Sequence, residues 1–85
     1  MMTDLNEKRK LEVADLSCIM QTESGRNVIR RIIEESGYFY DTFDQDAIQH
    51  AKRAGKRSVA VWLIEELKQA APNDFIQLLK EHFDD

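Results

Sequence analysis

A chain of 85 residues with 42% hydrophobic and 33% charged side chains is long enough for one small globular domain and too short for two. Its single cysteine excludes an intrachain disulfide and a cysteine-based zinc cage, and no apolar run approaches the roughly 20 residues that span a bilayer. The composition therefore predicts a protein of the reduced cytosol, outside the membrane. Its net charge of −4 opposes long-range attraction to nucleic acid.

The first predicted helix spans about residues 3–20. Its polar beginning, residues 1–10, is expected to be a partly frayed N-terminal extension to a helical domain of residues 11–83. Apolar side chains then recur with helical spacing, which predicts a buried face made by Val13, Leu16 and Met20, with Leu11, Ala14 and Cys18 beside it. The Cys18 thiol is therefore predicted to be buried and unreactive.

The second predicted helix begins after Thr22, a good N-cap, and ends near Gly37, where a left-handed stop is expected. Its buried apolar face is predicted to be Val28, Ile29, Ile32 and Ile33. An aromatic connection follows, in which Phe39 and Phe43 are expected to attach the chain to the core.

The third predicted helix spans about residues 44–71. An apolar stripe with a spacing of three or four residues is expected to face the core: Ile48, Ala51, Gly55, Val59, Leu63, Leu67 and Ala70. Residues 59–64 are apolar all round, so a buried strand is the alternative for them, although the strong helix formers that follow favour a helix. Gly55 is predicted to mark a kink or a close approach of another helix.

The fourth predicted helix begins at Pro72, because proline fits the first helical turn. Its buried face is predicted to be Phe75, Ile76, Leu79 and Phe83. Residues 84–85 form an acidic tail that opposes the helix dipole. The four segments together predict an all-α fold, a small four-helix bundle in a single domain.

No constellation of residues predicts a catalytic site, a cofactor or a metal ion. His50 and His82 lack metal-ligand spacing and are expected to be solvated surface histidines. Residues 55–58 (GKRS) lack the upstream glycine of a phosphate-binding loop. Adjacent acids such as Glu65 and Glu66 point about 100° apart on a helix and do not converge on a substrate. We therefore expect that the protein is not an enzyme.

Two features favour a binding surface. Lys52, Arg53, Lys56 and Arg57 form i, i+4 pairs, which predicts a two-column basic strip on one helix. Trp62 lies off the main apolar stripe and is an interface candidate beside that strip. The alternatives are a solvated charged face for the strip and cover by the first or fourth helix for Trp62. Four charges without interleaved aromatic residues predict weak or no nucleic-acid binding, so a protein partner is favoured.

Several motifs follow one another in a fixed order: Thr22-Glu23-Ser24-Gly25-Arg26, Gly37-Tyr38-Phe39, Phe43, Gly55-Lys56-Arg57-Ser58-Val59 and Trp62-Leu63. In this pattern, from about residue 15 to 81, the chain resembles a family of small uncharacterised tailed-bacteriophage proteins first described from a Bordetella podovirus. Ala54 and Ala60 stand where the family usually has an acid and a glycine. The resemblance implies a phage origin, a gene near the portal and capsid genes, and no accepted activity.

The motif residues also have structural interpretations. Thr22 caps a helix, Gly25 permits close helix packing, and Arg26 is expected to pair with an acid across the bundle. Arg57 is expected to pair with Asp41 or Asp44 in the connection.

These observations predict a non-enzymatic phage protein that acts by protein–protein contact, as a virion component or an assembly factor of the portal and capsid module. Its partner would be a phage structural protein that meets Lys52, Arg53, Lys56, Arg57 and Trp62. The alternative is a small acidic host-takeover factor that inhibits a host nucleic-acid-binding or defence protein, motivated by the acids at 41–46 and 81–85. Either role places the chain in the cytoplasm of the infected bacterium or in the virion, and leaves homo-oligomerisation open.

Overall fold

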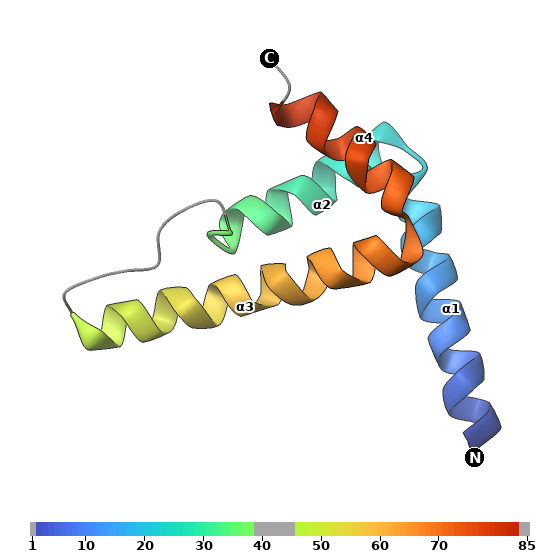
Figure 1. Cartoon of the computed structure of the whole chain (residues 1–85), viewed down its shortest axis with the longest axis horizontal. Coiled ribbons are helices and arrows are strands. Elements are labelled where there is room, and N and C mark those ends of the chain that lie inside the picture. Colours follow the sequence, from blue (N-terminus) through green and yellow to red (C-terminus); the bar gives the residue numbers. More distant parts are fainter. Residues whose placement is uncertain (1, 39–45, 84–85) are drawn as a thin grey trace.

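The computed structural model describes residues 2–38 and 46–83, and every regular element in this part of the chain is an α-helix. Helix α1 spans Met2–Met20, α2 spans Glu23–Glu35, α3 spans Ala47–Ala70 and α4 spans Pro72–Phe83 (Figure 1). The all-α, four-helix prediction is confirmed. Residues 59–64, for which a strand was the alternative, lie inside α3, and residues 2–10 form the first half of α1.

The helix ends form where local chemistry favours them. Thr22 Oγ1 accepts a hydrogen bond from the first turn of α2 at 3.0 Å, and Asp46 Oδ1 accepts one from the first turn of α3 at 2.9 Å. Gly37 has a φ of 74°, the left-handed conformation expected just after α2. Pro72 is the first residue of α4, as predicted.

The core lies between the C-terminal half of α3 and the other three helices. In the described part of the chain its buried side chains are Met20, Ile29, Ile33, Ala60, Leu63, Ile64, Leu67, Ala71 and Leu78. Leu16, Tyr38, Phe75 and Leu79 pack against this cluster and are partly buried. Since each helix contributes to one contiguous cluster, hydrophobic burial at this place holds all four together.

Beyond this core the molecule is flat and open. Its principal extents are 46 × 40 × 16 Å, so it is little thicker than a single helix with its side chains. The radius of gyration is 15.1 Å, compared with about 12 Å for a compact domain of this length. Helix α1 and the N-terminal half of α3 extend from the core in different directions instead of running along the other helices (Figure 1).

The predicted buried stripe of α3 is wrong in its first half. Leu63 and Leu67 are buried as predicted, and Ala60 and Ile64 complete the buried face. The earlier members of the stripe are exposed: Ile48, Ala51, Gly55 and Val59. The first buried residue of α3 is Ala60, because the core begins only there. We call residues 47–59 the α3 arm.

On α2 and α4 the buried face is narrower or shifted relative to the prediction. Ile29 and Ile33 are buried, whereas Val28 and Ile32 lie on a flank of α2 and are exposed. On α4, Leu78 is the buried residue and Ile76 is exposed. The Phe83 side chain lies outside the described residues, as do Phe39, Phe43, Asp41 and Asp44 in the connection between α2 and α3.

On α1 the prediction of a buried thiol is wrong. Met20 is fully buried as predicted, but Cys18 is exposed. Side chains at positions i and i+2 of a helix point about 200° apart, so the side chain at 18 points away from the core when that at 20 points into it. Leu11 is also exposed, because α1 extends beyond the core before Leu16.

Gly25 permits the close approach of α1 and α2. A Cβ at this position would overlap the carbonyl oxygen of Ile19 and would lie 2.9 Å from Thr22 Oγ1. The prediction of close packing at Gly25 is therefore confirmed. Gly55 differs, because beyond the neighbouring backbone of its own helix no atom of the described residues lies within 4 Å of its would-be Cβ, and α3 continues through it. The predicted close approach at Gly55 is wrong.

We expect Gly25→Ala to lower the free energy of unfolding by about 1–3 kcal/mol. The clash with a backbone oxygen outweighs the gain of about 1 kcal/mol in helix propensity, since the backbone cannot move aside as a side chain could. Gly55→Ala is the matched control and should raise the free energy of unfolding by about 0.5–1 kcal/mol. Urea unfolding followed by circular dichroism measures both. Equal effects of the two substitutions would contradict the role assigned to Gly25.

Candidate functional site

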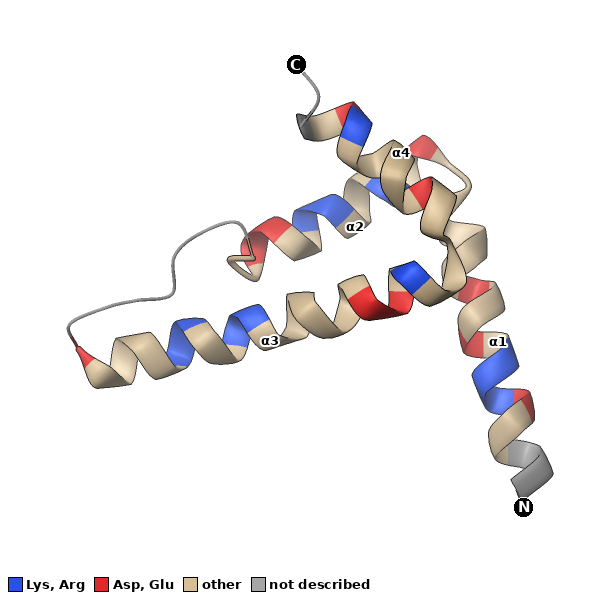
Figure 2. Ribbon diagram, viewed as in Figure 1, with Lys and Arg blue, Asp and Glu red and all other residues tan. Residues whose placement is uncertain are grey.

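The α3 arm carries the predicted basic strip. Lys52, Arg53 and Lys56 are exposed and Arg57 is half-buried. No acidic residue occurs from residue 47 to 64 of the sequence. Figure 2 shows these basic residues on the arm and an acidic band on α3 nearer to the core. The charged side chains of the arm are therefore all positive.

The five residues that were predicted to bind a partner do not all lie on one side of α3. At 100° per residue, Trp62 lies about 180° around α3 from Arg53 and about 140° from Arg57. The Arg57 guanidinium carbon lies 5.1 Å from the centroid of the Tyr38 ring, in a cation–π contact with the end of α2. Lys56 instead lines a groove between α2 and α3. Trp62 is thus on a different side of α3 from the two arginines.

The groove between α2 and α3 is open and largely apolar. Its volume is about 560 Å³, and three of its walls are exposed aliphatic side chains: Val28 at 52%, Ile32 at 42% and Val59 at 49%. Its charged lining is Arg31, Glu35 and Lys56. Such a groove suits an apolar side chain or helix face of a partner, because three aliphatic groups remain in water without one.

Trp62 borders a second pocket, between α1 and α3. This pocket has a volume of about 330 Å³, and its apolar lining includes Leu16, Ile19 and Leu63. The Trp62 side chain is 60% exposed, so α1 lies beside it without covering it. The alternative in which the first or fourth helix covers Trp62 is wrong.

An ion pair near Trp62 joins the first half of α1 to α3. Arg9 donates to Glu66, with Nη1 and Oε1 3.0 Å apart, and also to Gln69 Oε1 at 2.6 Å. The hydrogen bonds from Arg9 lower the pKa of the Glu66 carboxyl below its usual value, against the opposing effect of desolvation. A hydrogen bond from Trp62 acts in the same direction. These contacts fix the angle at which α1 crosses α3.

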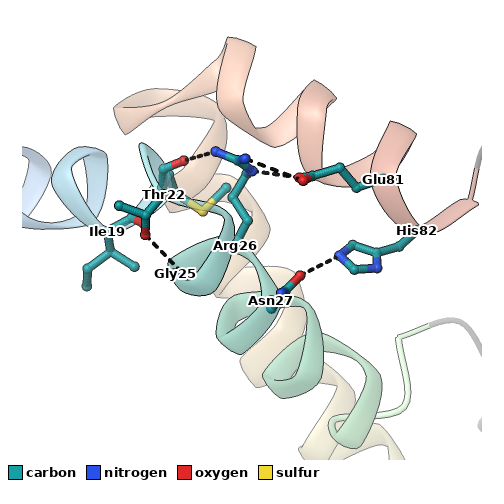
Figure 3. Close-up of polar contacts among 8 residues, drawn as sticks. Ile19, Thr22, Gly25, Arg26, Asn27, Glu81 and His82 are labelled. Atoms are coloured by element: carbon teal, nitrogen blue, oxygen red, sulfur yellow. Dashed lines mark hydrogen bonds and ion pairs between the residues drawn. The ribbon is translucent and has the colours of Figure 1, made fainter.

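Arg26 joins α2 to α4, which confirms the prediction that it pairs with an acid across the fold. Its Nε donates to Glu81 Oε1 at 2.6 Å, and its Nη1 donates to the carbonyl oxygen of Met20 at 3.0 Å (Figure 3). The side chains are only 13% and 19% exposed. Hydrogen bonding by Arg26 lowers the pKa of Glu81, and the same bond raises that of Arg26. The arrangement is structural, since each of the three guanidinium nitrogens donates a hydrogen bond within the protein.

The two histidines differ from the prediction of solvated surface residues. His82 Nε2 lies 3.0 Å from Asn27 Oδ1 and forms a part-buried hydrogen bond between α4 and α2 (Figure 3). His50 is half-buried in the α3 arm. Within residues 2–38 and 46–83, no three histidine, cysteine or acidic side chains come close enough to hold a metal ion. None of the helices described is both long and apolar enough to cross a membrane.

The comparison with protein families decides which kind of protein this is. A family model described as Bbp19-like phage protein matches residues 16–80, most of the chain. The chain belongs to the Bbp19-like phage protein family. No curated protein and no solved structure matches it. The resemblance seen in the ordered motifs is therefore confirmed, and the Bbp19-like region contains the α3 arm, the α2–α3 groove and Trp62.

The groove was not predicted, although the sequence of this Bbp19-like chain contains a signal for it in the apolar face of α2. The four apolar residues at positions 28, 29, 32 and 33 cover about 140° of the helix circumference, which is wider than a single neighbour covers. Ile29 and Ile33, at one edge of this arc, enter the core, and Val28 and Ile32, at the other edge, line the groove.

We expect the urea midpoint of the Bbp19-like protein to fall as the pH is lowered from about 5 to 3. The pKa of Glu81 is lower in the folded protein than its usual value, because Arg26 binds the charged form. The stabilisation is therefore present above the usual pKa and is lost as the pH falls through the lowered one. Glu81→Gln should flatten this pH dependence. Glu65→Gln, the same change at an exposed site 3.4 Å from Lys68, should flatten it less. Identical slopes in the two variants would contradict the role of Arg26.

Proposed function

We propose that this Bbp19-like protein is a non-enzymatic docking protein of the phage particle, either a virion component or an assembly factor of the portal and capsid module. It docks through the α3 arm, whose cations meet an acidic surface on another phage structural protein. The observation that carries the proposal is the position of four basic side chains on a helix that extends beyond the core.

The separation of charge along the chain supports docking through the arm. Residues 65–85 contain six acids and two lysines, so the chain's own negative charge lies at the other end of α3 and in α4. The arm of 13 residues is about 20 Å long, which exceeds the Debye length of about 8 Å at physiological ionic strength. The basic strip is therefore screened from most of the acids of residues 65–85.

A protein surface fits the strip better than nucleic acid does. Four cations on a chain of net charge −4 supply little of the phosphate neutralisation that drives nucleic-acid binding. No aromatic residue lies among the four to stack on bases. Carboxylates at fixed positions on a protein, in contrast, match the planar fork of arginine side chains.

The test uses a phage that carries this gene. We expect quantitative mass spectrometry to find the wild-type chain at a fixed copy number in gradient-purified virions or in purified assembly intermediates. Lys52→Glu combined with Arg53→Glu should lower that copy number by about tenfold or more, because it reverses two charges of the strip. Lys56 and Arg57 are left unchanged in this variant, because Lys56 lines the groove and Arg57 contacts Tyr38.

The matched control is Lys8→Glu combined with Lys10→Glu, which makes the same change of charge on exposed positions of α1. This variant should be incorporated as the wild type is, and circular dichroism should show equal helicity for all three proteins. Equal incorporation of both double variants would contradict docking through the arm. Absence of the wild-type chain from particles and intermediates, with capture of a host protein, would instead support the host-takeover alternative.

A further inference from the structure

One side of the α2–α3 pair is covered only in part. Helix α4 packs on the flank of α2 that bears Arg26. The other flank bears Val28 and Ile32, which line the open groove together with Val59 of α3. Helix α1 crosses this side at the end where Ile19 meets Gly25, and leaves the rest of the groove uncovered.

The groove and the Trp62 pocket are neighbours along α3. Val59 and Trp62 are three residues apart, so their side chains are neighbours on one face of α3. Ile19 of α1 lines the same pocket as Trp62. We call Ile19, Val28, Ile32, Val59 and Trp62 the open face; all five are exposed. Small monomers rarely leave such a contiguous apolar patch in water, so the open face indicates an interface.

Opposite charges flank the two ends of the open face. Arg31 and Lys56 line the groove end, and Glu12 and Asp15 line the pocket end. Residues of the other sign, including Glu35 in the groove, reduce these charges without reversing them. A surface with a positive and a negative end is complementary to itself when a second copy is turned by 180°.

The accessible surface area of the chain also indicates that a partner is missing. The accessible surface is 6403 Å², whereas a compact monomer of 9.9 kDa exposes about 5,200 Å². The excess of about 1,200 Å² is more than the roughly 800 Å² that each partner buries in an interface of standard size. One interface of standard size would therefore account for about two-thirds of the excess.

We propose that the open face is the contact between two copies of this chain, related by a two-fold axis near Val59. The groove end of each copy meets the pocket end of the other, and Arg31 and Lys56 of each approach Glu12 and Asp15 of its partner. This contact shares Lys56 and Val59 with the α3 arm but leaves out Arg53, which lies about 120° around α3 from Val59.

Sedimentation equilibrium over a range of concentrations tests the dimer. The apparent mass should rise from 9.9 kDa toward twice that value. Ile32→Lys should weaken association by about a hundredfold, because it places an ammonium in the contact. Ile76→Lys is the matched control on α4, at a side chain that is equally exposed and outside the open face, and should associate as the wild type does. Both variants should keep wild-type helicity.

A wild-type mass that stays at 9.9 kDa would overturn the proposal, as would equal association of the two lysine variants. Trp62, the single tryptophan of the chain, gives a second readout. Its fluorescence should shift to shorter wavelength as the copies associate, and an unchanged spectrum on dimerisation would place the contact elsewhere. Arg31→Glu should weaken the dimer, and adding Asp15→Arg should restore it. Failure of this rescue would overturn the two-fold arrangement, and neither result bears on incorporation into particles.

Discussion

One large side chain from each helix fills the centre of this molecule. Met20, Ile33, Leu67 and Leu78 are the largest fully buried side chains, and they come from α1, α2, α3 and α4 in turn. Burying each contributes about 1.5–3 kcal/mol, so losing any one of them would remove a large part of a small domain's stability. The tight turn at Gly25 brings α1 and α2 into this cluster. The positions of the parts of α1 and α3 that extend beyond this cluster depend on it.

The helices could be predicted from the sequence because their limits are set locally, by Thr22, Gly37 and Pro72. The buried face of α3 could not. The predicted stripe from position 51 to 67 advances in steps of four residues, and each step turns 40° beyond a full circle. Over four steps the stripe therefore winds about 160° around the helix, so Leu67 faces the core while Ala51 faces water. Only the positions of the other helices decide where the core begins.

The candidate site could likewise be predicted only in part from the sequence. The exposed basic strip followed from charge pattern alone, and the pairing of Arg26 followed from its motif. Its partner Glu81 lies 55 residues away, a separation that local sequence does not encode. Trp62 is exposed, but nine residues separate it from Arg53 and turn it to the opposite side of α3 from that arginine. The open face could not be predicted, because it depends on which side chains α1 and α4 leave uncovered.

The α3 arm also acts as a lever. Its base is held in the core at Ala60, and its tip, about 20 Å away, bears no buried side chain. A tilt of about 10° at the base would carry the tip about 3 Å, which is the length of a hydrogen bond. The basic strip, residues 52–57, lies about 5–12 Å from the base, so the same tilt moves it by about 1–2 Å without any change in the strip itself. Substitutions at the base would alter the fit at the tip.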